Sequence, residues 1–422
     1  MTSSAHPRSR YPGWPIAWAL AVTQTVGYGV LFYAYAVLTL PMELELGLRR
    51  SDTSGAFSLG LLIAGLAALP IGRFVDRFGA RGIMTIGSLL AGGLVFAWSY
   101  VHDLTGLYLV QAGIGLVMAA VTYEVAFAVI ARWFRRDRIR ALLIVTLVAG
   151  LASTIFVPLT TVLTETLGWR AALRVLAGIL WVATVPLHGL VLRRDPEPLG
   201  WTRDGRSVAG DAAADLAAEH ETVERSIGAR DAWRRGTFWW LTGAFALDRM
   251  VTVAVGAHAV PLLLERGHAA GWVATAAGSI GLLQVAGRLI FAPATRRYSL
   301  AHLAIATNLV RAASLLAVWL LPGVVGMWTF AVLFGLANGA ATLARAGLVA
   351  ETYGPAHYGT INGSMTTAVA LLQTVAPLAV GALRVTTGGY GWGLAMLTLL
   401  ALFAALAIEV PRRQHNLSAA PS

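Results

Sequence analysis

The stretch Gly72-Arg73-Phe74-Val75-Asp76-Arg77-Phe78-Gly79-Ala80-Arg81 joins two apolar runs of the chain. Its glycines permit a tight turn between two helices. Its carboxylate, on Asp76, is placed to meet the N-terminal end of a neighbouring helix or an arginine, and charge-assisted hydrogen bonds of that kind are strong. We therefore predict a connection between helices whose acid holds one arrangement closed. The alternative is a plain turn whose arginines only mark one side of the molecule.

The chain around this turn is too apolar for a water-soluble protein. It has 422 residues, of which 57% are hydrophobic and 13% are charged, against roughly 25% charged in soluble domains. Twelve spans of about 20 residues would occupy about 240 positions. We predict an all-α polytopic membrane protein. The high hydrophobicity excludes a disordered chain, and the absence of cysteine excludes a disulfide scaffold.

Twelve apolar runs are long enough to cross a bilayer. The first is too long for the apolar segment of a cleavable signal, so we interpret it as the first span. The runs lie at residues 14–38, 56–74, 82–100, 106–131, 141–164, 171–192, 237–263, 270–292, 299–320, 323–349, 359–383 and 390–410.

The distribution of arginine predicts the orientation of these spans. The chain has 32 arginines, no lysine and a net charge of +11, a balance that would ordinarily suggest a nucleic-acid partner. The arginines instead cluster between apolar runs: 22 fall on one side and six on the other. By the positive-inside rule, both termini and the long central loop are cytoplasmic in a multi-pass protein of the inner (cytoplasmic) membrane, and we expect no nucleic acid.

The two halves of the chain look related. Gly72-Arg73 has a counterpart in Gly287-Arg288, Pro158 has one in Pro377, and both halves place a glycine-tryptophan element after their fifth span. This recurrence suggests a duplicated six-helix unit with a central site between the repeats. The predicted domains are residues 1–192, a central loop at 193–236, and residues 237–422. Within the loop, residues 212–224 fit either a solvated linker or a short amphipathic helix.

The turn at Gly72 to Arg81 resembles the signature loop of the major facilitator superfamily, which reads Gly, three residues, Asp, a basic residue, one residue, Gly, one residue and Arg. The resemblance covers nearly the whole chain and implies two pseudo-symmetric six-helix bundles, transport by alternating access, and a gating role for this loop. The gating residues are Gly72, Arg73, Asp76, Arg77, Gly79 and Arg81.

Within the superfamily the chain is most similar to the monocarboxylate transporter and oxalate/formate antiporter branch. Two segments carry this likeness: His258 to Pro261 followed by Arg266-Gly267, and Arg132-Trp133-Phe134-Arg135-Arg136. The branch places an Asp four residues before a substrate-binding Arg in the eighth helix. Here the pair is Gln284 and Arg288, so the arginine is retained and the usual proton-coupling carboxylate is absent. Phe291 stands where a second copy of the signature loop would carry its acid.

Polar residues inside apolar spans are costly and therefore mark a cavity. The resemblance implies that helices 1, 4, 7 and 10 line it, and each of these carries such residues. The predicted substrate-binding residues are Arg288, Arg345, Tyr28, Tyr123, Gln24, Asn338 and Arg249, and the predicted proton-coupling residues are Glu124, Asp248 and His258.

The charges in the spans favour an anionic substrate. Four arginines, at 249, 288, 311 and 345, face only two acids, Glu124 and Asp248, and the arginine fork matches a carboxylate. Alternatives stay open at each acid. Glu124 and Arg345 form either a pair across the pathway or a fixed structural pair, Asp248 meets Arg311 or Arg288, and His258 is an outer gate, a proton group or a packing residue.

Other chemistries lack their motifs. The sequence holds no P-loop, no nucleophile elbow and no histidines at metal-ligand spacing, so we expect no enzyme activity, no cofactor and no metal. We predict a monomeric secondary active transporter that is driven by protons or by exchange. Its predicted substrate is a small organic anion, either a monocarboxylate or a dicarboxylate. The alternatives are an exporter of a drug, a metabolite or a toxic oxyanion, and a transporter-like sensor without net flux.

Overall fold

The computed structural model describes residues 11–199, 201–205, 226–373 and 375–419, with side chains up to Arg412. The described chain has twelve helical segments long and apolar enough to cross a membrane, and each of the twelve predicted runs falls on one of them. The possible helix at residues 212–224 lies outside the described residues.

Six spans form the first half. In chain order they consist of α1 (Gly13–Tyr28), η1 (Gly29–Tyr33) and α2 (Ala34–Leu46), then α3 (Arg50–Phe78), α4 (Ala80–Trp98), α5 (Leu104–Val121) with α6 (Tyr123–Trp133), α7 (Arg138–Ala149) with α8 (Ala152–Leu167), and α9 (Trp169–Pro186) with η2 (Leu187–Val191).

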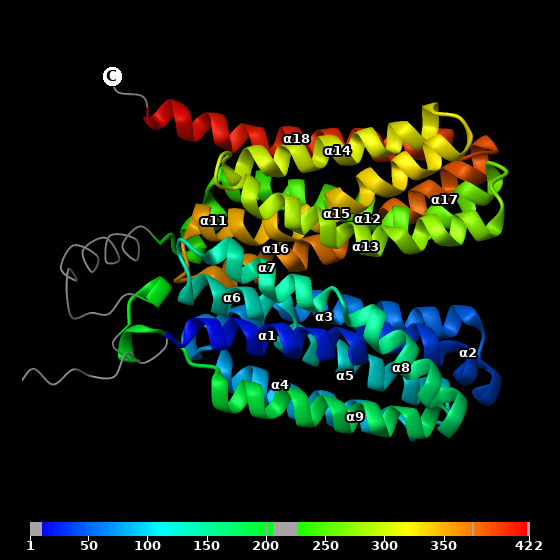
Figure 1. The fold of residues 1–422 in the computed structure, drawn as a ribbon, viewed down its shortest axis with the longest axis horizontal. Coiled ribbons are helices and arrows are strands. Elements are labelled where there is room, and N and C mark those ends of the chain that lie inside the picture. The colour runs from blue at the N-terminus through cyan, green and yellow to red at the C-terminus, as the bar shows by residue number, and fades with distance from the viewer. Residues whose placement is uncertain (1–10, 200, 206–225, 374, 420–422) are drawn as a thin grey trace, which may run out of the picture.

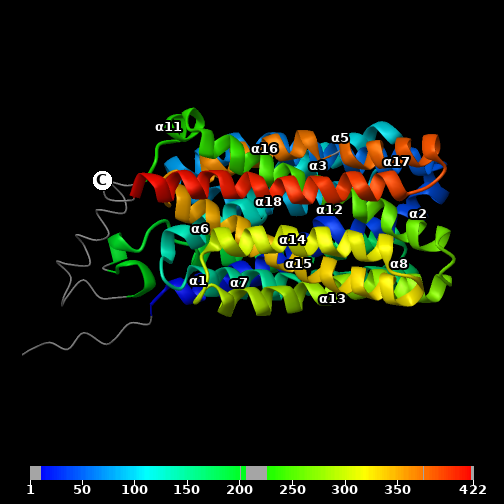
Figure 2. The same ribbon diagram turned by 90° about the horizontal axis from the view of Figure 1, so that it is seen from above.

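The second half also has six spans, preceded by three short segments: η3 (Glu197–Leu199), η4 (Arg203–Gly205) and α11 (Ala229–Arg234). The spans are α12 (Gly236–Glu265), α13 (Ala270–Ala294), α14 (Leu300–Leu320), α15 (Gly323–Tyr353), α16 (Tyr358–Leu372) with α17 (Val375–Thr387), and α18 (Gly391–Ala419). Figure 1 shows the two halves as two bundles of roughly parallel rods, and Figure 2 shows the same rods from above, where the halves overlap.

Glycine lets corresponding helices approach closely in the two halves. A Cβ atom on Gly115 of α5 would collide with the carbonyl oxygen of Gly60 in α3. In the second half, a Cβ atom on Gly287 of α13 would collide with the backbone of α15, and one on Gly339 of α15 with that of α13. The predicted pseudo-symmetry therefore extends to how the second and fourth spans of each half pack.

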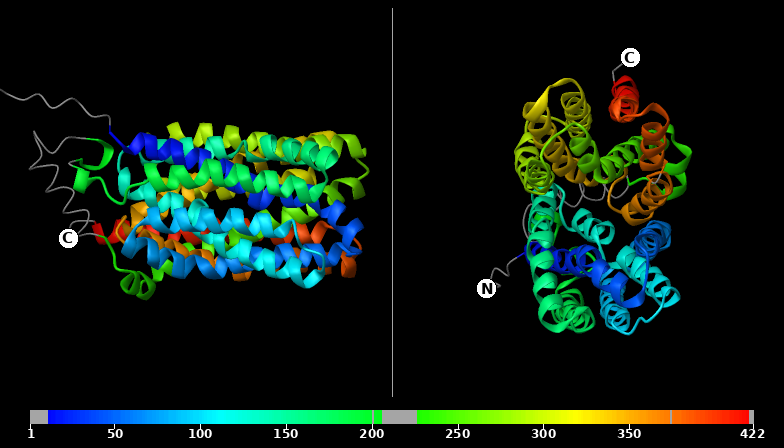
Figure 3. Two further views of the ribbon diagram at one scale, coloured as in Figure 1. Left: turned by 90° about the horizontal axis from the view of Figure 1, so that it is seen from below. Right: turned by 90° about the vertical axis from the view of Figure 1, so that its right-hand side faces the viewer.

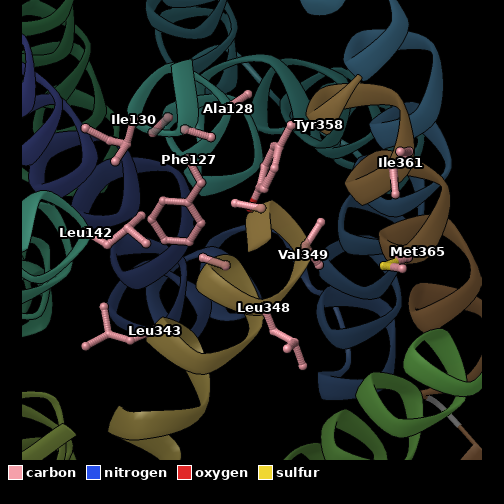
Figure 4. Close-up of a cluster of buried hydrophobic side chains, with 14 of the residues drawn as sticks. Phe127, Ala128, Ile130, Leu142, Leu343, Leu348, Val349, Tyr358, Ile361 and Met365 are labelled. Atoms are coloured by element: carbon pink, nitrogen blue, oxygen red, sulfur yellow. The ribbon is translucent and has the colours of Figure 1, made fainter. Parts of the chain in front are cut away.

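The hydrophobic core shows where the two halves meet. We call the end of the bundle that carries the described residues nearest the two termini the terminal end, and the opposite end the far end (Figure 1). At the terminal end one cluster of buried side chains contains residues from both halves. Figure 4 shows part of it, in which Phe127 and Leu142 of the first half and Leu343, Tyr358 and Ile361 of the second half belong to one cluster.

Toward the far end, the other two buried clusters each belong to a single half. One draws its described residues only from the first six spans and the other only from the last six. The right panel of Figure 3 shows the bundles from that end. The halves are therefore packed together at the terminal end and packed separately toward the far end.

Candidate functional site

The carboxylate of Asp76, near the end of α3, fastens the two halves together. Its oxygens accept hydrogen bonds from the backbone N–H groups of Gly359 (3.0 Å) and Thr360 (2.7 Å), at the start of α16. Arg132 lies 3.8 Å from the same carboxylate and donates to the Asp76 carbonyl (3.1 Å). The acid thus meets both kinds of partner that the sequence allowed. We call Asp76, Arg132, Gly359 and Thr360 the latch.

The other residues of the signature loop surround the latch. Gly72 is indispensable to the close approach, because a Cβ atom there would collide with the carbonyl oxygen of Gly359. Gly79 makes the turn with φ +83°, which favours glycine. The three remaining residues are basic: Arg73 lies over the Trp233 ring (5.7 Å), Arg77 over the Phe78 ring (5.0 Å), and Arg81 donates to the Gly189 carbonyl (2.7 Å).

The fourth span is broken near its middle. Helix α5 ends at Val121 and α6 begins at Tyr123, because the backbone of Thr122 is extended (φ −97°, ψ −166°). Gln24 of α1 donates from Nε2 to the freed carbonyl of Val121 (2.8 Å) and is fully buried. The positive end of the α6 dipole therefore lies inside the protein, beside Glu124. Only a β-branched threonine marks this break in the sequence, which is too weak a signal to predict it.

Two predicted tyrosines come together at this break. The rings of Tyr28 and Tyr123 are 4.7 Å apart, and Tyr123 stacks on Phe127 at 4.9 Å. The Tyr28 hydroxyl lies within electrostatic reach of Glu124 and of Arg249 from the other half. Helices of both halves therefore contribute to one group of side chains.

Arg288 of α13 reaches across to the first half. Its side chain is buried, and Nη1 donates to the Thr146 carbonyl of α7 (2.7 Å). Its Nε finds no hydrogen-bond partner among the described residues. The guanidinium is within electrostatic reach of Tyr33 and Tyr123. A buried donor without a partner is unfavourable, so this N–H keeps the capacity for one further hydrogen bond.

Arg249 and Arg345 supply two further cations. Arg249 is exposed although it lies within a span, and its Nε donates to the side chain of Gln373 (3.2 Å). Arg345 donates to Thr366 (2.7 Å) and lies over the ring of Phe245 (5.5 Å). It is within electrostatic reach of Glu124 but donates its hydrogen bonds elsewhere, so the two groups face each other across the halves without forming a tight pair.

Asp248 takes part in a different, internal network. It pairs with Arg311 of α14, whose side chain is fully buried. Arg311 also donates to the Asn338 side chain (2.9 Å), which accepts from Thr252 as well (3.3 Å). Of the two partners that the sequence left open for Asp248, the structure selects Arg311. This network lies within the second half, so it ties α12, α14 and α15 together.

Comparison with known proteins gives this arrangement its family. A model of the Major Facilitator Superfamily matches residues 20–267. The chain belongs to the major facilitator superfamily.

Superfamily relatives share part of the sequence. Human monocarboxylate transporter 11 is 31% identical over 185 residues, which is 43% of this chain and 38% of that protein. The uncharacterized MFS-type transporter YcxA of Bacillus subtilis is 25% identical over 248 residues, 57% of this chain and 55% of that protein. The matched regions therefore span less than two thirds of either relative.

Solved structures of the superfamily share the whole fold. The fucose:proton symporter FucP of E. coli superposes with a TM-score of 0.72 at 12% identity and covers 95% of this chain and 99% of its own. The human organic anion transporter MFSD10 gives a TM-score of 0.70 at 15% identity, with coverage of 96% and 100%. These likenesses establish the twelve-helix fold of a multi-pass membrane protein.

The side chains that come together where the halves meet are Tyr28, Tyr123, Glu124, Arg249, Arg288 and Arg345, and we call them the central group. In this superfamily member, His258 lies apart from the central group. Its Nε2 donates to the Pro377 carbonyl of α17 (3.0 Å), and Nδ1 is 3.4 Å from the Tyr390 hydroxyl. All three residues belong to the second half and lie toward its far end. These contacts are those of a packing residue, and the roles of His258 as a proton group or an outer gate stay predictions.

We expect the Asp248 network to govern the stability of this superfamily fold. Replacing Asp248 by Leu should lower the free energy of unfolding by about 3 to 5 kcal/mol, because it leaves a buried arginine without its counter-ion. Thermal melting of the detergent-solubilised protein measures the loss. Removing both charges, with Asp248→Leu and Arg311→Met, should restore much of it. A single variant as stable as the wild type would contradict a structural role for the pair.

Proposed function

We propose that the protein is a secondary active transporter of a small organic anion, a monocarboxylate or a dicarboxylate. The observation that carries the proposal is the charge of the central group. With Arg311 neutralised by Asp248, three arginines (249, 288 and 345) remain against the single carboxylate of Glu124. A surplus of cations between low-dielectric walls attracts an anion, and arginine binds carboxylates through paired hydrogen bonds.

The packing of the two halves supports transport by alternating access. We place the terminal end in the cytoplasm because most arginines lie there. In that orientation, the latch and the shared core close the cytoplasmic side. The far ends of the two halves are packed separately, which leaves the other side free to open. The structure then corresponds to an outward-facing state. Transport requires the latch to break and the far ends of the two halves to come together.

Glu124 is the carboxylate best placed to couple transport to protons. It accepts a hydrogen bond from Thr122 (3.3 Å) at the broken helix and lies within electrostatic reach of Arg345. Asp248, the other candidate, is held by Arg311 within one half. A proton on Glu124 would remove the one negative charge that competes with the substrate for the central arginines. Proton and anion would therefore bind together, as symport requires.

Uptake by purified protein in liposomes tests this proposal. We expect labelled lactate, pyruvate, oxalate or formate to accumulate when a pH gradient, acidic outside, is imposed. The Glu124→Gln variant should lose gradient-driven uptake while still exchanging anion for anion, because glutamine cannot release a proton. Asp103→Asn, which alters an acid in a loop between α4 and α5, serves as the control. Movement of a cationic dye without any anion flux would contradict the assignment.

A further inference from the structure

A run of aromatic rings lines one side of the central group. From the far end inward, the rings follow the order Tyr35, Phe57, Phe32, Tyr28 and Tyr123. Successive ring centroids are 4.7, 5.4, 6.4 and 4.7 Å apart. The rings come from the first span (α1, η1 and α2), the second span (α3) and the fourth span (α6), so three spans of the first half build the wall. We call this set, together with Tyr33 beside Phe32 (5.2 Å), the aromatic wall.

The inner rings of the wall are not sealed in a packed core. Tyr28, Phe32, Tyr33, Phe57 and Tyr123 are all half-buried, in contrast to fully buried aromatic side chains elsewhere in the chain such as Trp98 and Tyr353. Rings that only filled the core would be fully buried, because protein cores are closely packed. Part of each ring is therefore free to touch a ligand.

The wall faces the cations of the other half. Tyr28 lies within electrostatic reach of Arg249, and Tyr33 and Tyr123 lie within reach of Arg288. The first half thus presents flat apolar surface and the second half presents guanidinium groups. A ligand that satisfies both must carry a negative charge at one end and a flat apolar body at the other.

We propose that the preferred substrate is an aryl carboxylate, with its ring against Tyr28 and Phe32 and its carboxylate toward Arg249 and Arg288. The inference rests on the proposed anion transport and narrows it. A short carboxylate such as lactate or formate would reach the arginines but leave the wall in contact with water. An aromatic ring gains from offset or edge-to-face stacking beyond what its apolar area alone supplies.

Three carboxylic acids of the same charge distinguish the effect of a flat ring on affinity from the effect of ring size. Benzoate and cyclohexanecarboxylate carry rings of the same number of carbon atoms, but only benzoate is flat, and lactate carries no ring. Isothermal titration of the purified protein should give benzoate a Kd about 10-fold lower than that of cyclohexanecarboxylate, since one aromatic pair contributes roughly that factor. Lactate should bind more weakly than either. Equal affinity for the two ring acids would overturn the proposal.

A variant of the wall tests whether these rings cause the preference. Phe32→Leu keeps apolar volume but removes stacking, so we expect benzoate to lose most of its advantage while cyclohexanecarboxylate binds as before. Phe96→Leu is the matched control, because Phe96 packs on Tyr100 and Trp181 away from the central group. An unchanged preference in Phe32→Leu would overturn the role of the wall. If none of the three acids binds, the proposed anion transport itself is wrong, and this inference falls with it.

Discussion

Replacing Arg288 by Gln is expected to weaken binding of the organic anion by a factor of about 30 to several thousand. Losing one partner of a buried, hydrogen-bonded charge pair costs about 2 to 5 kcal/mol, and each 1.4 kcal/mol is a factor of about ten. Arg288 fits this case because it is buried and its Nε has no partner among the described residues. Titration calorimetry and counterflow in liposomes measure the loss.

Two further variants separate the binding role of Arg288 from a structural one. Arg288 also donates to the Thr146 carbonyl in the other half, so Arg288→Lys, which keeps the charge, should recover part of the affinity that Arg288→Gln loses. Arg384→Gln is the control: Arg384 pairs with Glu265 on an exposed part of the second half, and its loss should leave affinity unchanged. Wild-type affinity in Arg288→Gln would remove this residue from the site.

Replacing Asp76 by Asn is expected to shift the protein toward opening at the terminal end. The neutral amide offers one acceptor in place of two carboxylate oxygens, so at least one of the bonds from Gly359 and Thr360 is lost and the other is weakened. A hydrogen bond to a charged group contributes about 1.5 to 3 kcal/mol. The equilibrium between the two states should therefore move by a factor of at least about ten.

The absence of cysteine from the sequence makes this shift measurable with pairs of introduced spin labels. Labels at the exposed positions Leu190 and Tyr298 report on the terminal end, and labels at Tyr100 and Val324 report on the far end. Asp76→Asn should lengthen the first distance and shorten the second. Asp103→Asn removes the charge of a helix cap within one half (Gly106 N–H to Oδ1, 2.6 Å) but keeps an oxygen that can accept the bond, and it should change neither distance. Unaltered distances in Asp76→Asn would mean that the latch does not hold this state.

The fold was predictable because apolar spans and arginine clusters are strong, repeated signals. Each of the twelve runs recurs as a span, since a bilayer demands about 20 apolar residues from every crossing. The breaks inside spans were not predictable. Thr122 interrupts the fourth span because tertiary contacts, such as the bond from Gln24 to the Val121 carbonyl, satisfy groups that a helix would otherwise pair.

The sequence identified the charged residues of the candidate site, but not which of them contact one another. The sequence supplied Arg249, Arg288, Arg345 and Glu124, which the structure places near one another at the meeting of the halves. It left several pairings open for Asp248, because helical periodicity shows which face a residue occupies but not which neighbour lies opposite. Of the aromatic wall, the sequence predicted only Tyr28 and Tyr123 as site residues. Phe32 and Phe57 are ordinary apolar residues in a sequence of this composition.

The latch also has a consequence for how the two halves have been free to diverge. Asp76 accepts hydrogen bonds from main-chain N–H groups of Gly359 and Thr360, and the Thr360 side chain hydrogen-bonds to the same carboxylate. The two main-chain bonds depend on no particular side chain at position 360, and only proline, which lacks the N–H group, would remove one of them. This part of the contact therefore leaves no correlated pair of substitutions for an alignment to detect. The first half can then retain its acid although Phe291 stands at the matching place in the second half.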